Sequence, residues 1–160
     1  MQRVRTDSSY LRLVISSGIQ RSATFRAMVE RLERSDLIVE VQCGRFIDSR
    51  LAGRTVFLTA RPAVRYVLVE ISCPITSVPA LGTIGHELSH ALEIASARWV
   101  VDGETLAQLY GQIGYPTYGP TSEQFGQYET ADALDAGERV HHELFHPSEP
   151  TRRLAWILTK

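Results

Sequence analysis

Two stretches of this 160-residue chain carry the pattern His-Glu-x-x-His, HELSH at 86–90 and HELFH at 142–146. In a helix, histidines four residues apart lie one turn apart and can bind one metal ion together. The glutamate that follows the first histidine is then placed to act as a base toward water at that ion. The pattern predicts metal-dependent chemistry, and the surrounding elements must decide which copy performs it.

The first copy lies in the middle of a helix expected over residues 78–97. At about 100° per residue, His86 and His90 fall on one side of this helix with Gly82, Thr83, Glu93 and Ala97. The opposite side is apolar and consists of Leu81, Ile84, Leu88, Ala91, Leu92 and Ala95. This division predicts a helix packed on a sheet with its histidines facing a cleft. We expect His86 and His90 to bind Zn²⁺ and Glu87 to act as the general base.

The second copy lies in the last expected helix, whose apolar stripe is Ala133, Ala136, Gly137, Val140 and Leu144. His142 and His146 project away from that stripe, Pro147 ends the helix, and only a short tail follows that could cover them. We expect an exposed histidine pair, with adventitious metal binding at the surface as the alternative.

Catalytic zinc usually takes three protein ligands and a water, so a third ligand must be found. Glu129 is the main candidate because it is in phase with the apolar stripe of the last helix, where an unpaired carboxylate is costly. It could instead stabilise the helix N-terminus. Glu93 is the rival, but its alternative role is a hydrogen bond to a ligand histidine or an ion pair. Weaker candidates are Glu104, Glu123 and Glu143.

Other zinc patterns are absent after the first copy. Glu93 stands where a glycine would precede a third histidine, and no histidine follows before residue 141. The only methionines are Met1 and Met28, so none can form a turn beneath the metal after the motif. These observations exclude a metzincin-like site.

HELSH together with YETAD at 128–132 resembles the gluzincin branch of the zincin metallopeptidases, in which a separate helix supplies a glutamate ligand. The helix IGHELSHALEIA is also similar to one found in short bacterial proteins. The resemblance is specific over residues 78–97 and looser over 126–140. It departs from the family pattern at Tyr128, where the family often has asparagine.

This resemblance implies a reduced zincin-like fold with His86, His90 and Glu129 as zinc ligands. It also implies that Glu87 acts as general base and acid, and that Asp132 is a partner of a ligand histidine.

The elements that must position these residues indicate an α+β domain over residues 1–160. A helix from Ser22 or Thr24 to about Asp36 precedes strands at 36–43, 54–60 and 65–72, expected as a mainly antiparallel meander. The sheet part spans about 36–75, the motif helix about 78–97 and a helical part about 102–147. Asp102 is expected to cap a helix, 114–127 to form a loop, and the last helix to begin near Tyr128.

Composition narrows the function classes. Lys and Arg number 17 against 18 Asp and Glu, which gives a net charge of −1 and no basic region for nucleic acid. No apolar stretch approaches the roughly 20 residues that cross a bilayer. We expect a soluble protein, cytoplasmic as given, or secreted or periplasmic if a signal peptide was removed. Cys43 and Cys73 are either a disulfide or two buried thiols.

The functional hypothesis is a zinc metallopeptidase in which Glu87 takes a proton from zinc-activated water and delivers it to the leaving amine. The substrate would be a peptide or protein, which could add to an edge of the sheet as an extra strand. Candidate donors to the oxyanion are Tyr115, Tyr118 and Tyr128. The competing hypothesis is a non-catalytic metal-binding or protein-interaction domain that retains the helix.

Overall fold

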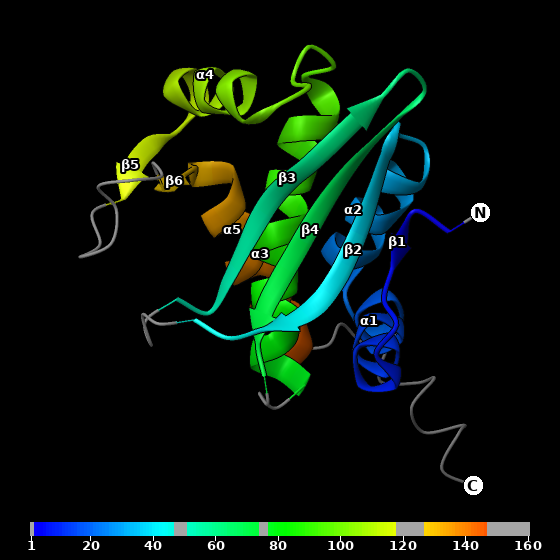
Figure 1. Cartoon of the computed structure of the whole chain (residues 1–160). Coiled ribbons are helices and arrows are strands. Elements are labelled where there is room, and N and C mark those ends of the chain that lie inside the picture. The colour runs from blue at the N-terminus through cyan, green and yellow to red at the C-terminus, as the bar shows by residue number, and fades with distance from the viewer. Residues whose placement is uncertain (1, 47–50, 74–76, 118–126, 147–160) are drawn as a thin grey trace, which may run out of the picture.

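The computed structural model of the chain describes residues 2–46, 51–73, 77–117 and 127–146 (Figure 1). Five helices and six strands occur among them, and four of the strands form one mixed sheet. This arrangement confirms the predicted α+β class. Tyr118, Glu123 and the end of the predicted helical part, residue 147, lie outside the described residues.

The four-stranded sheet has the order β1-β2-β4-β3, formed by β1 (Val4–Arg5), β2 (Leu37–Gly44), β4 (Val64–Ser72) and β3 (Gly53–Arg61). β2 pairs in parallel with both β1 and β4, and within this sheet β3 and β4 form the one antiparallel pair. The prediction of a mainly antiparallel meander is therefore wrong. Leu37, Ile38, Val39 and Val41 of β2 are buried, as suits a central strand, whereas only Gly53 is buried in the edge strand β3.

The helices α1 (Ser9–Arg21) and α2 (Ala23–Glu33) connect the parallel strands β1 and β2, as a parallel pair requires. Ser22 caps α2 by accepting a hydrogen bond from the backbone N–H of Phe25 at 2.9 Å, as its residue type predicts. Neither β1 nor α1 was expected from the sequence.

The motif helix α3 (Ser77–Ser96) runs behind β3 and β4 and packs along α5 (Ala131–Phe145) (Figure 1). A Cβ atom at Gly137 of α5 would lie 3.1 Å from the Cβ atom of His86, so a larger residue would push the two helices apart. Most of α3 is buried, and no described helix is long and apolar enough to cross a membrane.

The buried side chain of Arg65 fixes the C-terminal end of α3 to the sheet. Its Nη1 atom donates to the carbonyl oxygens of Ile94, Ala97 and Val100 at 2.9, 2.8 and 3.0 Å. Its other nitrogens donate to both carboxylate oxygens of Asp36, at 2.8 and 2.9 Å. These bonds satisfy carbonyls that the end of a helix leaves free.

The segment after α3 departs from the sequence prediction at Glu129. α4 (Gly103–Ile113) begins after its cap Asp102 as expected, but β5 (Tyr115–Thr117) and β6 (Gln127–Glu129) then pair antiparallel. Thr130 has extended backbone angles and caps α5, which starts at Ala131 and not near Tyr128. Glu129 therefore ends a strand and does not belong to the helix.

Cys43 and Cys73 form a disulfide, with Cα atoms 5.4 Å apart. Cys43 is exposed and Cys73 half-buried, so the alternative of two buried thiols is not what the structure shows. The bond joins the carboxyl ends of the neighbouring parallel strands β2 and β4. It lies where the chain leaves the sheet toward the N-terminus of α3.

Candidate metal centre

Three potential metal ligands converge from two elements that lie far apart in the sequence. His86 and His90 come from the middle of α3, and Glu129 comes from the end of β6. Glu129 Oε2 lies 3.3 Å from His86 Nε2, and Glu129 Oε1 lies 3.4 Å from His90 Nε2. One ligand atom from each residue lies within 4.8 Å of the other two. The group could hold a metal ion.

The donor set and its spacing fit a first-row transition metal. Two imidazoles and one carboxylate are common protein ligands of zinc, bound at about 2.0 to 2.2 Å. In a tetrahedral site such bond lengths place ligand atoms about 3.3 to 3.6 Å apart. The two nitrogen to oxygen distances within the cluster, 3.3 and 3.4 Å, agree with that spacing. Related first-row metals that accept nitrogen and oxygen ligands fit the same group of residues.

Glu87 lies beside this group and is almost fully buried, with 4% of its surface exposed. Burial raises the pKa of its carboxyl group, and the neighbouring His86 and His90 oppose that rise. Thr55 on β3 donates a hydrogen bond from Oγ1 to Glu87 Oε2 at 2.8 Å. The edge strand thus holds the predicted general base in place from outside its own helix.

Glu93 is not placed as a third ligand but contacts His90 from the other side. His90 Nδ1 donates to Glu93 Oε2 at 2.9 Å, while His90 Nε2 faces Glu129. Thr130 Oγ1 donates to Glu93 Oε1 at 2.6 Å. Carboxylates bonded in this way fix the orientation and tautomer of metal-binding histidines.

Asp132, which the family resemblance implied for this role, is exposed in the first turn of α5. Among the described residues it makes no hydrogen bond to either histidine. Glu93 takes this role because it lies one turn from His90 on α3 and contacts it directly, whereas Asp132 lies two residues beyond Thr130, the N-cap of α5.

Charges within the cluster reinforce one another. Burial alone would lower the pKa of His90, but the carboxylates of Glu129 and Glu93 outweigh it and raise the pKa to about 9. Burial alone would raise the pKa of Glu129, but hydrogen bonds from His86 and His90 keep it well below its usual range. The lowered pKa of Glu129 keeps its carboxyl group ionised, so the cluster contains a carboxylate that can bind a cation.

Tyr110 of α4 closes the buried side of the cluster. Its ring lies edge-on to His90 with the centroids 5.6 Å apart, and Tyr128 stacks on it at 6.0 Å. Burial, together with the Glu93 carboxylate that accepts a hydrogen bond from its hydroxyl, raises the pKa of Tyr110. Tyr128 thus packs against Tyr110, and Tyr115 is exposed on β5. The role of an oxyanion donor stays a prediction.

The second copy of the motif is built differently. His142 and His146 are exposed, with ring centroids 4.7 Å apart, as predicted. Glu143 accepts hydrogen bonds from the hydroxyl groups of Ser22 and Thr24 at 2.6 and 2.7 Å. Its carboxylate therefore anchors the start of α2 to α5. Glu104, another weak candidate, is exposed in the first turn of α4.

Thr55, Thr130 and Tyr110 are the site residues that the sequence did not identify. Thr130 carried a local signal, since a threonine before an apolar-periodic run favours an N-cap. Thr55 and Tyr110 carried none, because their contacts depend on how β3 and α4 pack around α3. Comparisons with protein-family models, curated proteins and solved structures found no match to this chain.

Proposed function

We propose that this protein is a zinc-dependent metallopeptidase with a gluzincin-like site. His86, His90 and Glu129 would hold the zinc ion, and Glu87 would act as general base and acid. The observation that carries the proposal is the position of Glu129, which reaches both imidazoles from β6 at 3.3 and 3.4 Å. This contact between distant segments supports the proposal, because a catalytic zinc site needs a third protein ligand beside two imidazoles.

The residues around the proposed zinc site have separate roles in the reaction. A zinc ion in such a site lowers the pKa of water and polarises a substrate carbonyl group. Glu87 accepts the proton of the attacking water and returns it to the leaving amine. Its raised pKa suits a group that must both take and give a proton, and Thr55 keeps it oriented. Glu93 and Thr130 keep His90 and Glu129 in position.

The edge strand β3 supports a peptide as substrate. It pairs with β4 on one side, and no described strand pairs with its other side. Thr55, which contacts Glu87, belongs to this strand, so an extended peptide added along it would pass the base. Backbone pairing would set the register of the substrate and bring one carbonyl group to the metal.

The test combines metal analysis with hydrolysis of a quenched fluorescent peptide library. The purified protein is expected to contain about one zinc per chain and to cleave peptides. Glu87→Gln should keep the zinc and lose activity by at least ~100-fold, since the proton acceptor is gone. Glu138→Gln, an exposed glutamate of α5, is the matched control and should behave as wild type.

Two results would contradict this function. Peptide cleavage that persists in Glu87→Gln would refute the role of the base. Stable zinc binding at this site without hydrolysis of any peptide would instead identify a metal-binding domain without peptidase activity.

A further inference from the structure

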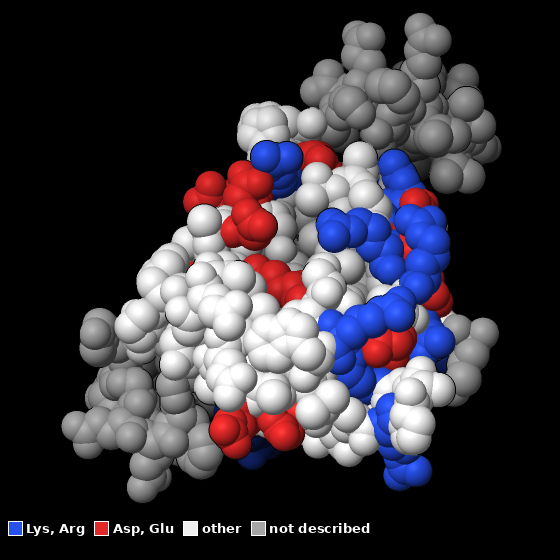
Figure 2. All heavy atoms as spheres, turned by 90° about the horizontal axis from the view of Figure 1, so that it is seen from above, with Lys and Arg blue, Asp and Glu red and all other residues white. Residues whose placement is uncertain are grey.

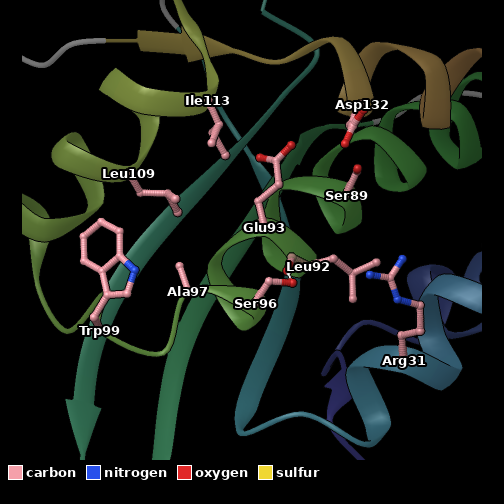
Figure 3. Close-up of a pocket in the computed structure, with 10 residues that line it drawn as sticks. All are labelled: Arg31, Ser89, Leu92, Glu93, Ser96, Ala97, Trp99, Leu109, Ile113 and Asp132. Carbon is pink, nitrogen blue, oxygen red and sulfur yellow. Dashed lines mark hydrogen bonds between the residues drawn. The ribbon is translucent and has the colours of Figure 1, made fainter.

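Glu93, which contacts His90 of the metal centre, also lines a cavity. Residues of α2, α3, α4 and α5, with Ala97 and Trp99 after α3, line an open surface cavity of about 390 Å³ (Figure 3). This volume is within the range of small-molecule pockets, roughly 300 to 1,000 Å³. The cavity and the metal cluster lie at opposite edges of His90, because Nδ1 faces Glu93 and Nε2 faces Glu129.

The lining of this cavity is divided by polarity. Figure 3 shows Trp99, Leu109 and Ile113 on one side, and Arg31 and Asp132 on the other. Glu93 lies between the two sides (Figure 3). One half of the cavity can therefore receive an apolar group, and the other half presents both signs of charge.

The surface around the cavity shows the same division. Seen from above in Figure 2, arginines gather on the side where α2 and β1 lie, with carboxylates among them, while the α4 side is mostly uncharged. Arg31 comes from the basic side, and Trp99 and Ile113, which are 46% and 47% exposed, come from the neutral side. The cavity lies where the two surfaces meet.

The charged groups of the polar half are free to bind a ligand. Arg31 and Asp132 are both exposed, and neither forms an ion pair with another described residue. Arg31 can therefore bind a carboxylate of a ligand, and Asp132 can bind an ammonium group. By contrast, Glu93 already accepts hydrogen bonds from His90 and Thr130, so it contributes charge more than free acceptor capacity.

We propose that this cavity binds an apolar α-amino acid. Such a ligand carries an ammonium group and a carboxylate on one carbon and an apolar side chain on the same carbon. The carboxylate would bind Arg31, the ammonium group Asp132, and the side chain would lie against Trp99, Leu109 and Ile113. This proposal does not depend on peptide hydrolysis at the metal centre.

Trp99 supplies a direct readout because the chain has only two tryptophans, Trp99 and Trp156. In the full-length Trp156→Phe variant, emission comes from Trp99 alone, and L-leucine is not fluorescent. L-leucine is expected to change this emission with a dissociation constant on the order of 1 mM, as suits a ligand of so few atoms.

Matched ligands separate the two charges. L-leucinamide lacks the carboxylate and N-acetyl-L-leucine lacks the ammonium group, so each should bind about tenfold more weakly than L-leucine. L-alanine should also bind more weakly, because it cannot reach the apolar half. Equal binding of L-leucine and either blocked derivative would overturn the proposal, as would no change in Trp99 emission.

Two variants then assign the contacts. Arg31→Gln should weaken L-leucine about tenfold and leave L-leucinamide unchanged. Asp132→Asn should weaken L-leucine similarly and leave N-acetyl-L-leucine unchanged. Asp135→Asn, on the same helix but outside the cavity, is the control and should bind L-leucine as before. If either test variant binds L-leucine like the control, the assignment of that charge is refuted.

Discussion

Thr55 and Glu87 join the edge strand to the motif helix through one hydroxyl group. Thr55 Oγ1 donates to Glu87 Oε2 at 2.8 Å, and it also lies 3.1 Å from the backbone oxygen of Glu87. A Cβ atom at Gly53, two residues earlier, would lie 2.8 Å from Glu87 Oε1. The start of β3 therefore determines both the orientation of this carboxylate and the space around it.

Removal of the Thr55 hydroxyl is expected to impair catalysis without loss of metal. If the proposed peptidase function holds, Thr55→Val should lower kcat about 10- to 100-fold. Valine has nearly the shape of threonine but no hydroxyl group to orient Glu87. Thr55→Ser should keep most of the activity. Zinc content and thermal stability are measured for both variants. Equal kcat in the valine and serine variants would show that the hydroxyl has no positioning role.

Loss of the Glu129 carboxylate is expected to weaken metal binding. Glu129→Ala should lower the affinity for Zn²⁺ by at least about 100-fold, since one of three ligands is removed. Competition with a fluorescent chelator measures the affinity. His142→Ala, which removes one histidine of the second copy, should bind zinc as wild type. The reverse outcome, with metal lost only in His142→Ala, would move the site to the end of α5.

The sequence predicted those parts of the site that depend on one helix. The spacing of His86, Glu87 and His90 and the faces of α3 follow from helical periodicity, which is local. The capping residues Ser22 and Asp102 were likewise visible as residue types in the right places. The α+β class followed from the order of such elements.

The parts that could not be predicted depend on packing between distant segments. Nothing local in the sequence shows that β3 is an edge strand. A meander would pair β2 with β3, which follow one another in the sequence, but β2 pairs with β4 instead. Glu129 was selected as a ligand from a helical phase, yet it belongs to β6. The sequence therefore identified the right residue for a different reason. Glu129 is placed near the histidines by the end of β6 and not by a turn of α5.

Reduction of the Cys43–Cys73 disulfide is expected to lower the stability of the fold. The bond closes a loop with a sequence separation of 30 residues, and bonds of this kind contribute about 2 to 4 kcal/mol. Urea unfolding with and without dithiothreitol measures this difference. The Cys43→Ser/Cys73→Ser variant should be insensitive to the reductant. A wild-type protein with the same unfolding midpoint in both conditions would contradict the expectation.

The ion pair of Arg65 and Asp36 is expected to make stability depend on pH. The hydrogen bond and charge of Arg65 lower the pKa of Asp36 in the folded state, despite partial burial. In the unfolded chain the pKa returns to about 3.9. The carboxylate therefore contributes stability fully above that value, and the contribution is lost as pH falls through the lower folded pKa.

Two variants test this contribution in metal-free protein, so that loss of a metal ion does not affect the result. Asp36→Asn should be less stable than wild type at pH 7, and the difference should shrink below about pH 4. Arg65→Met should cost more, about 3 to 5 kcal/mol, because it leaves Asp36 and the carbonyls at the end of α3 without their donor. Urea unfolding at pH 7 and pH 3 measures both. A difference between wild type and Asp36→Asn that stays constant across this range would mean that the carboxylate charge of Asp36 does not stabilise the end of α3.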